Sequence, residues 1–468
     1  MRRAKIVCTI GPASNSKRIL SSLIKNGMDV ARLNFSHGTH EEHGRVIRLI
    51  REIAGRFNSP VAIIQDLQGL KIRVGKFREG EAFLKTGTRF TITTRDVSGD
   101  ERIVSTSYKG LPSDVRKGNC ILLDDGIIKL EVLGVNGKDI NCRVIDGGML
   151  KDNKGMNLPG VSISASTITK KDIEDIAFGL EHKVDYIALS FVRSSKEIKS
   201  VKDIICKHGA DIPVIAKIEK PEAVENLDEI LGLSDGIMVA RGDLGVEMSP
   251  EKVPIIQKEI IKKANEANIP VITATQMLES MTEHPRPTRA EASDVANAVL
   301  DETDVLMLSA ETSLGKYPVE SLKMMVKIIE ETERVFLRRR FWDIHSADFP
   351  EATVGAASLA AKSIGAKAMV AFTKSGLTAL LISKQRPPMP IIALTPDDAV
   401  RKRMSLYWGV IPLLLRKIVS TDEMIDEVDR VIIEKRLAKK GDGIVILSGA
   451  PIYKKGTTNL MKLHRVGE

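Results

Sequence analysis

The residues of this chain best suited to chemistry are a lysine and two carboxylates near its middle, Lys217, Glu219 and Asp243. Lys217 and Glu219 stand two positions apart at the end of a short apolar run, and alternate residues of a strand share one face. Asp243 follows the next apolar run, which places a second carboxylate at the neighbouring strand end. Two carboxylates beside a lysine suit a hard dication that leaves positions open for substrate oxygens. On spacing alone, a structural ion pair explains these residues equally well.

Eight short runs rich in β-branched residues have the length of strands, and segments with helical spacing separate most of them. Because these runs are apolar almost throughout, both of their faces should be buried, as in a parallel sheet. Eight such units predict an α/β fold with an eight-stranded β/α (TIM) barrel, and a doubly wound open sheet is the alternative. The runs are Lys5–Ile10, Val30–Phe35, Val61–Leu67, Tyr186–Val192, Pro213–Glu219, Gly236–Ala240, Pro270–Ala274 and Asp304–Ser309.

This alternation is interrupted once. From about residue 75 to residue 166 the helical pattern disappears, and short alternating segments separated by glycines predict a small β-barrel lid domain. After about residue 341 a second β/α alternation begins. We therefore expect a discontinuous catalytic barrel of residues 1–74 and 167–340, an inserted lid of residues 75–166 and a C-terminal α/β regulatory domain of residues 341–468. A lid placed after a barrel strand is able to close over the mouth where barrel active sites lie.

The composition excludes several classes of protein. The formal charge of +9 comes from 70 basic and 61 acidic residues, which alternate along predicted helices and form no basic stripe. The four cysteines are scattered without zinc-ligand spacing, and no apolar run has the length of a membrane span. We expect a cytoplasmic protein with no nucleic-acid or membrane partner. A local positive field in a cleft would still suit an anionic substrate.

Polar residues also close other predicted strands. Arg32 belongs to the segment Ala31–Gly38 that closes the second strand, and Arg73 to the segment that closes the third, where guanidinium groups suit bidentate contacts to phosphate. Thr275 closes the seventh strand, Ser309 closes the eighth, and the helical segment of residues 286–297 is unusually rich in charge. Each residue alone has an ordinary structural explanation. Their convergence on one barrel mouth contributes little to stability, so together they favour a catalytic site.

Three long motifs closely resemble the signature sequences of the pyruvate kinase family. They run from Pro213 to Lys220, from Ala240 to Glu247 and from Ala274 to Met281, and the resemblance extends over essentially the whole chain. It implies a phosphotransferase that converts phosphoenolpyruvate and ADP to pyruvate and ATP, the last step of glycolysis. It also implies a homotetramer.

The resemblance further implies roles for single side chains. Glu219 and Asp243 would hold the catalytic Mg²⁺ or Mn²⁺, and Lys217 would stabilise the transferring phosphoryl group and the enolate oxygen. The residues implied to bind substrate are Arg32, Lys217, Gly242, Asp243 and Thr275; those implied to relay a proton are Thr275 and Ser309; and those implied to contact the nucleotide are Arg32, Asn34, His37, Arg73 and Lys154.

One departure from the family concerns potassium. Members that require K⁺ hold it near Asn34, Ser36 and Asp66 and carry a glutamate five positions after that aspartate, where this chain has Lys71. An internal ammonium near the same three residues would supply the same positive charge. We therefore predict the K⁺-independent type, with no K⁺ requirement. The alternative is a Lys71 that only faces solvent.

The C-terminal domain contains one candidate effector site, the segment Thr373-Lys374-Ser375-Gly376-Leu377-Thr378 between a predicted strand and a predicted helix. N–H groups and the helix dipole bind phosphate at such turns. The family resemblance implies a sugar-phosphate effector here, with AMP as a further candidate, and Lys454 and Lys455 would close over the loop. An ordinary helix cap is the alternative.

Two other functions fit parts of the pattern. Carbon–carbon lyases that act on acyl-CoA esters and 2-oxo acids also place carboxylates around Mg²⁺ at strand ends, although they need no inserted lid and no C-terminal domain. A basic nucleic-acid-binding protein without catalysis is disfavoured by the diffuse charge and by the lack of interleaved aromatic residues.

Overall fold

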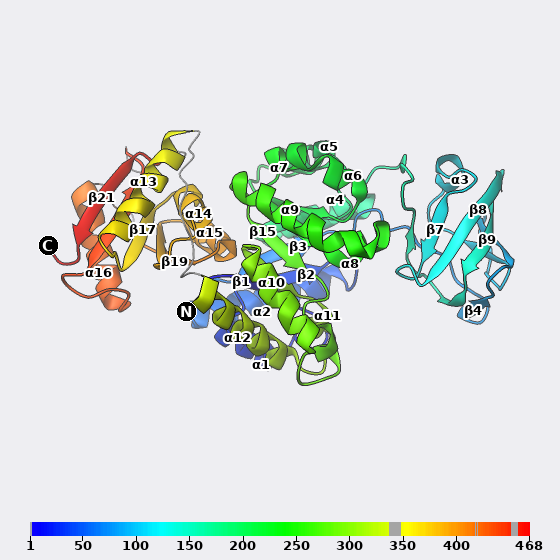
Figure 1. The fold of residues 1–468 in the computed structure, drawn as a ribbon, viewed down its shortest axis with the longest axis horizontal. Coiled ribbons are helices and arrows are strands. Elements are labelled where there is room, and N and C mark those ends of the chain that lie inside the picture. The colour runs from blue at the N-terminus through cyan, green and yellow to red at the C-terminus, as the bar shows by residue number, and fades with distance from the viewer. Residues whose placement is uncertain (1, 337–347, 417, 419, 451–456) are drawn as a thin grey trace.

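Eight parallel strands close into a barrel at the centre of the computed structural model, which describes residues 2–336, 348–416, 418, 420–450 and 457–468 (Figure 1). The strand order is β1-β16-β15-β14-β13-β12-β3-β2, and nearly every strand residue is buried. The closed barrel confirms the predicted fold class and excludes the open sheet. The strands are β1 (Lys5–Thr9), β2 (Val30–Asn34), β3 (Ala62–Asp66), β12 (Tyr186–Leu189), β13 (Val214–Ile218), β14 (Gly236–Ala240), β15 (Val271–Ala274) and β16 (Val305–Leu308).

Helices cover the outside of this barrel. Several of them begin at a threonine that caps the helix together with an acidic residue three positions later, as Thr39 does with Glu42 and Thr288 does with Glu291. These capping boxes fix where each loop from a strand end enters its helix. The helices are α1 (Lys17–Lys25), α2 (His40–Arg56), α4 (Lys170–Glu181), α5 (Ser195–Lys207), α6 (Pro221–Glu225), α7 (Leu227–Leu233), α9 (Val253–Glu266), α10 (Arg289–Leu300), α11 (Ala310–Ser313) and α12 (Pro318–Phe336).

The chain turns directly from β14 into a helix that the strand pattern does not predict. Arg241, Gly242 and Asp243, which follow the predicted run Gly236–Ala240, form the first turn of a short helix, α8 (Arg241–Glu247). The β-branched run stops at Ala240, and nothing in the local sequence separates a strand end from a helix start at this point.

The inserted segment forms a body with its own hydrophobic core beyond the barrel mouth (Figure 1). A six-stranded sheet of order β11-β7-β8-β9-β5-β6 lies with the two-stranded sheet β10-β4. A β-bridge between Arg73 and Gly155 joins the outgoing chain to the returning chain, so both crossings leave the barrel side by side. The elements are β4 (Glu81–Leu84), β5 (Arg89–Thr93), β6 (Ile103–Ser105), α3 (Leu111–Asp114), β7 (Cys120–Leu123), β8 (Ile128–Asn136), β9 (Asp139–Asp146), β10 (Gly148–Lys151) and β11 (Met156–Asn157).

The C-terminal α/β body lies on the opposite side of the barrel from the lid (Figure 1). Its sheet has the order β19-β18-β17-β20-β21, and only the edge strand β21 runs antiparallel. The proposed domain boundary at residues 340/341 lies outside the described residues. The elements are α13 (Phe349–Ser363), β17 (Ala368–Phe372), α14 (Leu377–Lys384), β18 (Ile391–Thr395), α15 (Asp398–Arg403), β19 (Val410–Leu414), α16 (Thr421–Glu434), β20 (Gly443–Ser448) and β21 (Leu460–Arg465).

Polar contacts join this body to the N-terminal end of the barrel. Lys5 Nζ donates to the carbonyl oxygen of Val410 at 2.8 Å, and Lys384 Nζ lies 2.6 Å from Asp304 Oδ2. The C-terminal body therefore lies away from the barrel mouth, and the lid lies at that mouth. In the described part of the chain, no helix is long and apolar enough to cross a membrane.

Candidate active site

A buried lysine lies at the centre of the barrel mouth. Lys217, on β13, places its Nζ 2.9 Å from Glu219 Oε1 and 3.2 Å from Asp66 Oδ1, and it donates a hydrogen bond to Ser190 Oγ at 2.7 Å. Arg32, on β2, reaches the same cluster because its Nε lies 2.6 Å from Asp66 Oδ2. Parallel strands thus bring together residues that are far apart in the sequence.

The charges of this cluster stabilise one another. Burial alone would lower the pKa of Lys217, but Asp66 and Glu219 raise that pKa above its ordinary value. Burial alone would raise the pKa of Asp66, but Lys217 and Arg32 lower it below the usual range of an aspartate. Both Lys217 and Asp66 therefore remain ionised at neutral pH, and Lys217 is a fixed cation.

Glu219 and Asp243 carry the features of a dication site. Burial raises the pKa of Glu219, the nearby charge of Asp243 raises it further, and Lys217 opposes the rise. Two carboxylates that repel each other in this way gain from a divalent cation between them. In the described part of the chain, no group of three or more His, Cys, Asp or Glu side chains could hold a metal. A dication bound here would keep positions for water or substrate oxygens, as Mg²⁺ commonly does.

The net charge of the cluster also suits a bound dication. Arg32 and Lys217 supply two positive charges, and Asp66, Glu219 and Asp243 supply three negative charges. These five side chains together therefore carry one more negative charge than positive, and a bound dication would reverse that balance in favour of phosphate and carboxylate groups.

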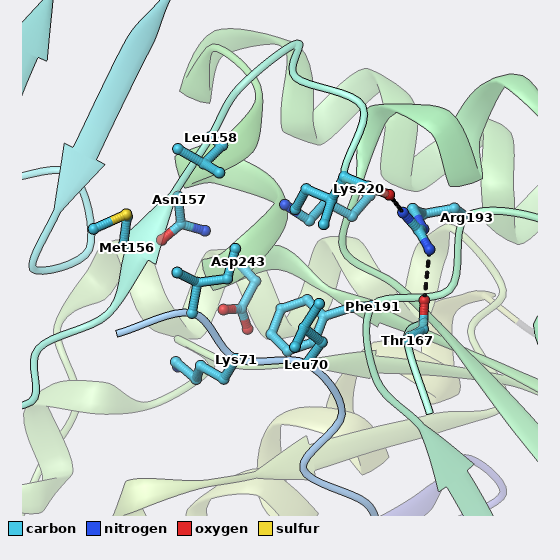
Figure 2. A pocket seen from close by; sticks show the side chains of 12 residues that line it. Leu70, Lys71, Met156, Asn157, Leu158, Thr167, Phe191, Arg193, Lys220 and Asp243 are labelled. Carbon is cyan, nitrogen blue, oxygen red and sulfur yellow. Dashed lines mark hydrogen bonds between the residues drawn. The ribbon is translucent and has the colours of Figure 1, made fainter. Parts of the chain in front are cut away.

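The lid reaches this site through β11. Asn157 Nδ2 donates to Glu247 Oε1 at 2.7 Å, and Lys220 forms an ion pair with the same carboxylate. Figure 2 shows Asn157, Lys220 and Asp243 around one pocket, together with Lys71. The pocket thus lies where the lid meets the barrel.

Thr275 stands beside the start of α8. Its Oγ1 accepts a hydrogen bond from the Gly242 N–H at 2.9 Å and donates to the Ala274 carbonyl at 2.6 Å. Thr275 and Gln276 have φ angles of 66° and 53°, in the left-handed region. Two consecutive residues other than glycine in that region cost on the order of 1–3 kcal/mol each, so the surrounding contacts must hold them there.

Ser309 has a different environment. Its Oγ is buried and, among the described residues, has no hydrogen-bond partner, while its backbone N–H donates to Glu311 Oε2 at 2.6 Å. In the described structure no hydrogen bond joins Ser309 to Thr275. A buried hydroxyl with unmet hydrogen-bonding capacity is unusual and suits a group that meets a ligand or water.

Besides Arg32, four residues are implied to contact the nucleotide, and two of them, His37 and Arg73, lie near each other. Burial lowers the pKa of His37, and the positive charges of Arg73, Lys71 and Arg32 lower it further. Arg73 donates to the Asn153 carbonyl at 2.9 Å. This part of the site therefore has a positive field.

The remaining two residues of that set are engaged inside the protein. Asn34 Oδ1 accepts from the Ser36 N–H at 3.1 Å, and Lys154 Nζ lies 2.8 Å from Asp124 Oδ1 within the lid. Lys154 must therefore exchange this partner before it contacts a ligand.

Lys71 lines the pocket that also contains Asp243 (Figure 2). In the described part of the chain, no hydrogen bond or ion pair joins its ammonium to Asn34, Ser36 or Asp66. Asp66 is already occupied by Lys217 and Arg32. The structure thus places Lys71 at the mouth, although not in contact with the three residues named from the sequence.

The candidate effector loop precedes α14. Gly376 has φ 92°, which favours glycine, and its N–H donates to Thr373 Oγ1 at 2.9 Å. Thr378 Oγ1 lies 2.7 Å from Thr458 Oγ1, and both residues are buried. Ser375 borders a cavity of about 590 Å³ between this body and the N-terminal end of the barrel. Lys454 and Lys455 lie outside the described residues.

The sequence reading missed three contributors to the site. Asp66 was assigned only to the potassium question, although it anchors both Lys217 and Arg32, and Ser190 was not singled out at all. Arg241 was read only as part of a motif, yet its side chain contacts the Thr275 loop. All three share one signal, a polar residue that is either the last residue of a buried strand, as Asp66 is, or the first residue after one, as Ser190 and Arg241 are.

Comparison with known proteins gives a consistent result along the chain. The family model described as pyruvate kinase, barrel domain, matches residues 1–322, and the model described as pyruvate kinase, alpha/beta domain, matches residues 351–464. Pyruvate kinase 2 of Synechocystis is 48% identical over 469 residues, which cover 99% of this chain and 79% of that protein. A pyruvate kinase of Mycobacterium intracellulare is 45% identical over 476 residues, which cover 100% of this chain and 99% of the relative.

A solved structure agrees with these sequence matches. The crystal structure of a pyruvate kinase from Cryptosporidium parvum superposes with a TM-score of 0.92 and 38% sequence identity, covering 99% of this chain and 96% of that chain. The matches span both the barrel and the C-terminal body, and they include Lys217, Glu219 and Asp243. The chain therefore belongs to the pyruvate kinase family.

Proposed function

We propose that this chain transfers the phosphoryl group of phosphoenolpyruvate to ADP and releases pyruvate and ATP. The observation that carries the proposal is the buried cluster at the barrel mouth, where Lys217 lies 2.9 Å from Glu219 and shares Asp66 with Arg32. Membership of the pyruvate kinase family supports the same reaction. A structural ion pair would not need an excess of negative charge at a site open to a pocket.

The transfer breaks the bond between phosphorus and the enol oxygen of phosphoenolpyruvate. It forms a new bond between that phosphorus and a β-phosphate oxygen of ADP. Such reactions depend chiefly on positioning and on neutralising negative charge. The Lys217 ammonium and the Arg32 guanidinium are fixed cations for that charge. Mg²⁺ or Mn²⁺ held by Glu219 and Asp243 would neutralise further charge on the substrate oxygens.

The enolate that remains must gain a proton at its methylene carbon to become pyruvate. We assign Thr275 and Ser309 to this hydroxyl relay. The buried and unpartnered Ser309 hydroxyl supports its place in the relay. The Gly242 amide, which now donates to Thr275, and the Asp243 amide beside it would hold the substrate carboxylate.

Contacts to the nucleotide phosphates are proposed for Asn34, His37, Arg73 and Lys154. The positive field that depresses the His37 pKa supports this assignment. We also propose that Lys71 supplies the positive charge that other family members obtain from K⁺, supported by its position in the pocket that contains Asp243.

An effector is proposed for the loop Thr373–Thr378, with a sugar phosphate or AMP as its ligand. The glycine turn at the start of α14 supports anion binding there. Isothermal titration with sugar phosphates and AMP is expected to show binding heat together with a kinetic effect. If neither ligand class gives binding heat or a kinetic effect, that result would contradict the assignment. A homotetramer is proposed from the family resemblance, and sedimentation velocity would measure it.

Pyruvate formation from phosphoenolpyruvate and ADP in the presence of Mg²⁺ tests the main proposal. We expect robust turnover, and no cleavage of acyl-CoA esters or 2-oxo acids. Cleavage of either of those substrates without pyruvate kinase turnover would instead favour the lyase alternative.

A further inference from the structure

The segment after β15 has an unusual backbone conformation. Thr275 and Gln276 both lie in the left-handed region, and neither is a glycine. Such a conformation persists only where surrounding contacts over-determine it. The contacts that hold this segment therefore decide where the Thr275 hydroxyl points.

Most of those contacts come from one side chain, Arg241 of α8. Its Nε lies 3.3 Å from the Ala274 carbonyl oxygen and 3.2 Å from that of Thr275, and its Nη2 lies 2.6 Å from the Thr275 oxygen. The same Nη2 lies 3.1 Å from the Gln276 oxygen and 2.8 Å from Met277 Sδ. One guanidinium thus donates hydrogen bonds to the carbonyl oxygens of three consecutive residues of the strained segment.

A carboxylate from a third element holds this guanidinium in place. Arg241 Nη1 lies 2.7 Å from Asp294 Oδ2, on α10, and 3.4 Å from Gln257 Oε1, on α9. The Arg241 side chain is only 9% exposed, whereas that of Asp294 is 35% exposed. The planar fork of an arginine suits several acceptors at fixed angles, and a lysine ammonium does not reproduce it.

The next residue along the chain connects this pair to the reaction site. The Gly242 N–H donates to Thr275 Oγ1 at 2.9 Å, so the residue that follows Arg241 touches the hydroxyl that Arg241 helps to fix. The charged segment of residues 286–297, which stood out in the sequence, supplies Asp294.

We propose that Arg241, held by Asp294, is a positioning residue that fixes the strained Ala274–Met277 segment so that the Thr275 hydroxyl serves the proton-transfer step. This inference rests on the proposed function. Arg241 itself touches no reacting atom and acts through Thr275.

The test separates proton transfer from folding. The full-length wild type, R241K and D294N are compared for kcat, for the KM of phosphoenolpyruvate and of ADP, and for Tm. Exchange of pyruvate methyl protons is followed by proton NMR in D₂O with Mg²⁺ and ATP. In that exchange a methyl C–H bond breaks, the proton passes to solvent and a C–D bond replaces it, so no redox partner is needed.

Arg51 offers a matched control at the other end of the barrel. It donates to the carbonyl oxygens of Val61 and Lys183 at 2.9 Å and 3.0 Å, and it lies 2.7 Å from Asp185. It therefore also combines backbone carbonyls with one carboxylate, although it lies away from the strained segment. R51K should lower Tm while kcat and exchange stay close to wild type.

For R241K we expect kcat and the exchange rate to fall together, on the order of 10- to 100-fold, because a small misplacement of a reacting group has effects of this size. The KM of ADP should stay close to the wild-type value. D294N should show a smaller loss in the same direction, and its partial exposure makes it the deciding variant if R241K does not fold.

Some outcomes would overturn the inference. R241K or D294N with wild-type kcat and exchange, and only a lower Tm like that of R51K, would make Arg241 a structural residue alone. A wild type that does not turn over phosphoenolpyruvate and ADP would instead overturn the proposed function, and this inference with it.

Discussion

Two buried lysines lie at opposite ends of the same barrel and have opposite electrostatic surroundings. At the mouth, Lys217 contacts Asp66, Glu219 and Ser190. At the N-terminal end, Lys384 of the C-terminal body contacts Asp304, the Asn265 side chain and the Ile269 carbonyl oxygen. Each lysine has three oxygen partners within hydrogen-bonding distance, so geometry alone does not distinguish a catalytic lysine from a structural one.

The balance of charge does distinguish them. Asp304 serves two cations, since Arg386 Nη2 also lies 2.8 Å from its Oδ1. Burial lowers the pKa of Lys384 to about 8, and the like charge of Arg386 adds to that effect against the attraction of Asp304. In the cluster of Lys217, Arg32, Asp66, Glu219 and Asp243, by contrast, carboxylates outnumber cations, and the pKa of Lys217 is raised.

This difference shows what each cluster is suited to do. The cluster of Lys384, Arg386 and Asp304 at the N-terminal end of the barrel has no spare negative charge. Its groups face one another across the contact between the barrel and the C-terminal body. The cluster around Lys217 at the barrel mouth has spare negative charge and opens to a pocket. It is therefore suited to bind a dication and an anionic substrate.

Removing part of the spare charge at the mouth should give the largest effect. We expect D243N to lower kcat by on the order of 10²-fold and to raise the Mg²⁺ concentration needed for half-maximal activity, because one of two carboxylate ligands is lost. Steady-state kinetics at varied Mg²⁺ measures both quantities.

Asp235 provides the control, because it directly precedes β14 and Asp243 follows that strand's other end. D235N should leave the Mg²⁺ dependence unchanged. Unchanged Mg²⁺ dependence in D243N would argue against a dication site at the mouth.

The effect of the Lys384 cluster should be visible in how the free energy of unfolding depends on pH. Because folding lowers the pKa of Lys384 to about 8 from an ordinary value of 10.5, the unfolded chain binds more protons between these values. The contribution of Lys384 to the free energy of unfolding should therefore rise as pH increases from about 8 to 10.5, on the order of 1–3 kcal/mol.

Denaturant unfolding of wild type and K384M at pH 7.5, 9 and 10 measures this contribution as the difference between the two proteins. The free energy of unfolding of the wild type should increase relative to that of K384M as the pH rises. A difference that does not vary with pH would mean that Lys384 stays protonated in the folded state.

The smallest expected effect concerns potassium. Replacing tetramethylammonium chloride with KCl at equal ionic strength should change activity by less than about twofold, because Lys71 already supplies a positive charge at the mouth. K71E should create K⁺ activation, whereas K76E, at an exposed lid position, should not. Many-fold activation of the wild type by K⁺ would contradict the proposal.

Sequence patterns predicted seven of the eight barrel strands to within one residue at each end, because the strands are buried on both faces and therefore form continuous apolar runs. Gly236–Ala240, for example, agrees with β14 at both ends. The run Tyr186–Val192 extends three residues beyond the end of β12. The edge strand β21 was missed because most of its residues are exposed and its sequence alternates only weakly. Exposure also explains why the short lid strand β4 was missed, whereas β6 has only three residues, which is too short for an alternation to be visible.

Only part of the site was open to prediction. The two-residue spacing of Lys217 and Glu219 was enough to predict a shared face, and their side chains lie 2.9 Å apart. The contact between Lys217 and Asp66 depends on which strands are neighbours in the closed barrel, which no local pattern contains. The left-handed pair Thr275 and Gln276 was equally hidden, since neither residue type signals that conformation.

The most direct test of the account substitutes the two lysines identically. K217M and K384M each remove one buried charge and keep a side chain of similar length, and both are measured for kcat and for Tm. We predict that K217M lowers kcat by about 10³-fold, whereas K384M lowers Tm and changes kcat by no more than about threefold. A K217M protein with near-normal turnover, or equal losses of kcat in the two variants, would contradict the assignment of the mouth cluster as the phosphoryl-transfer site.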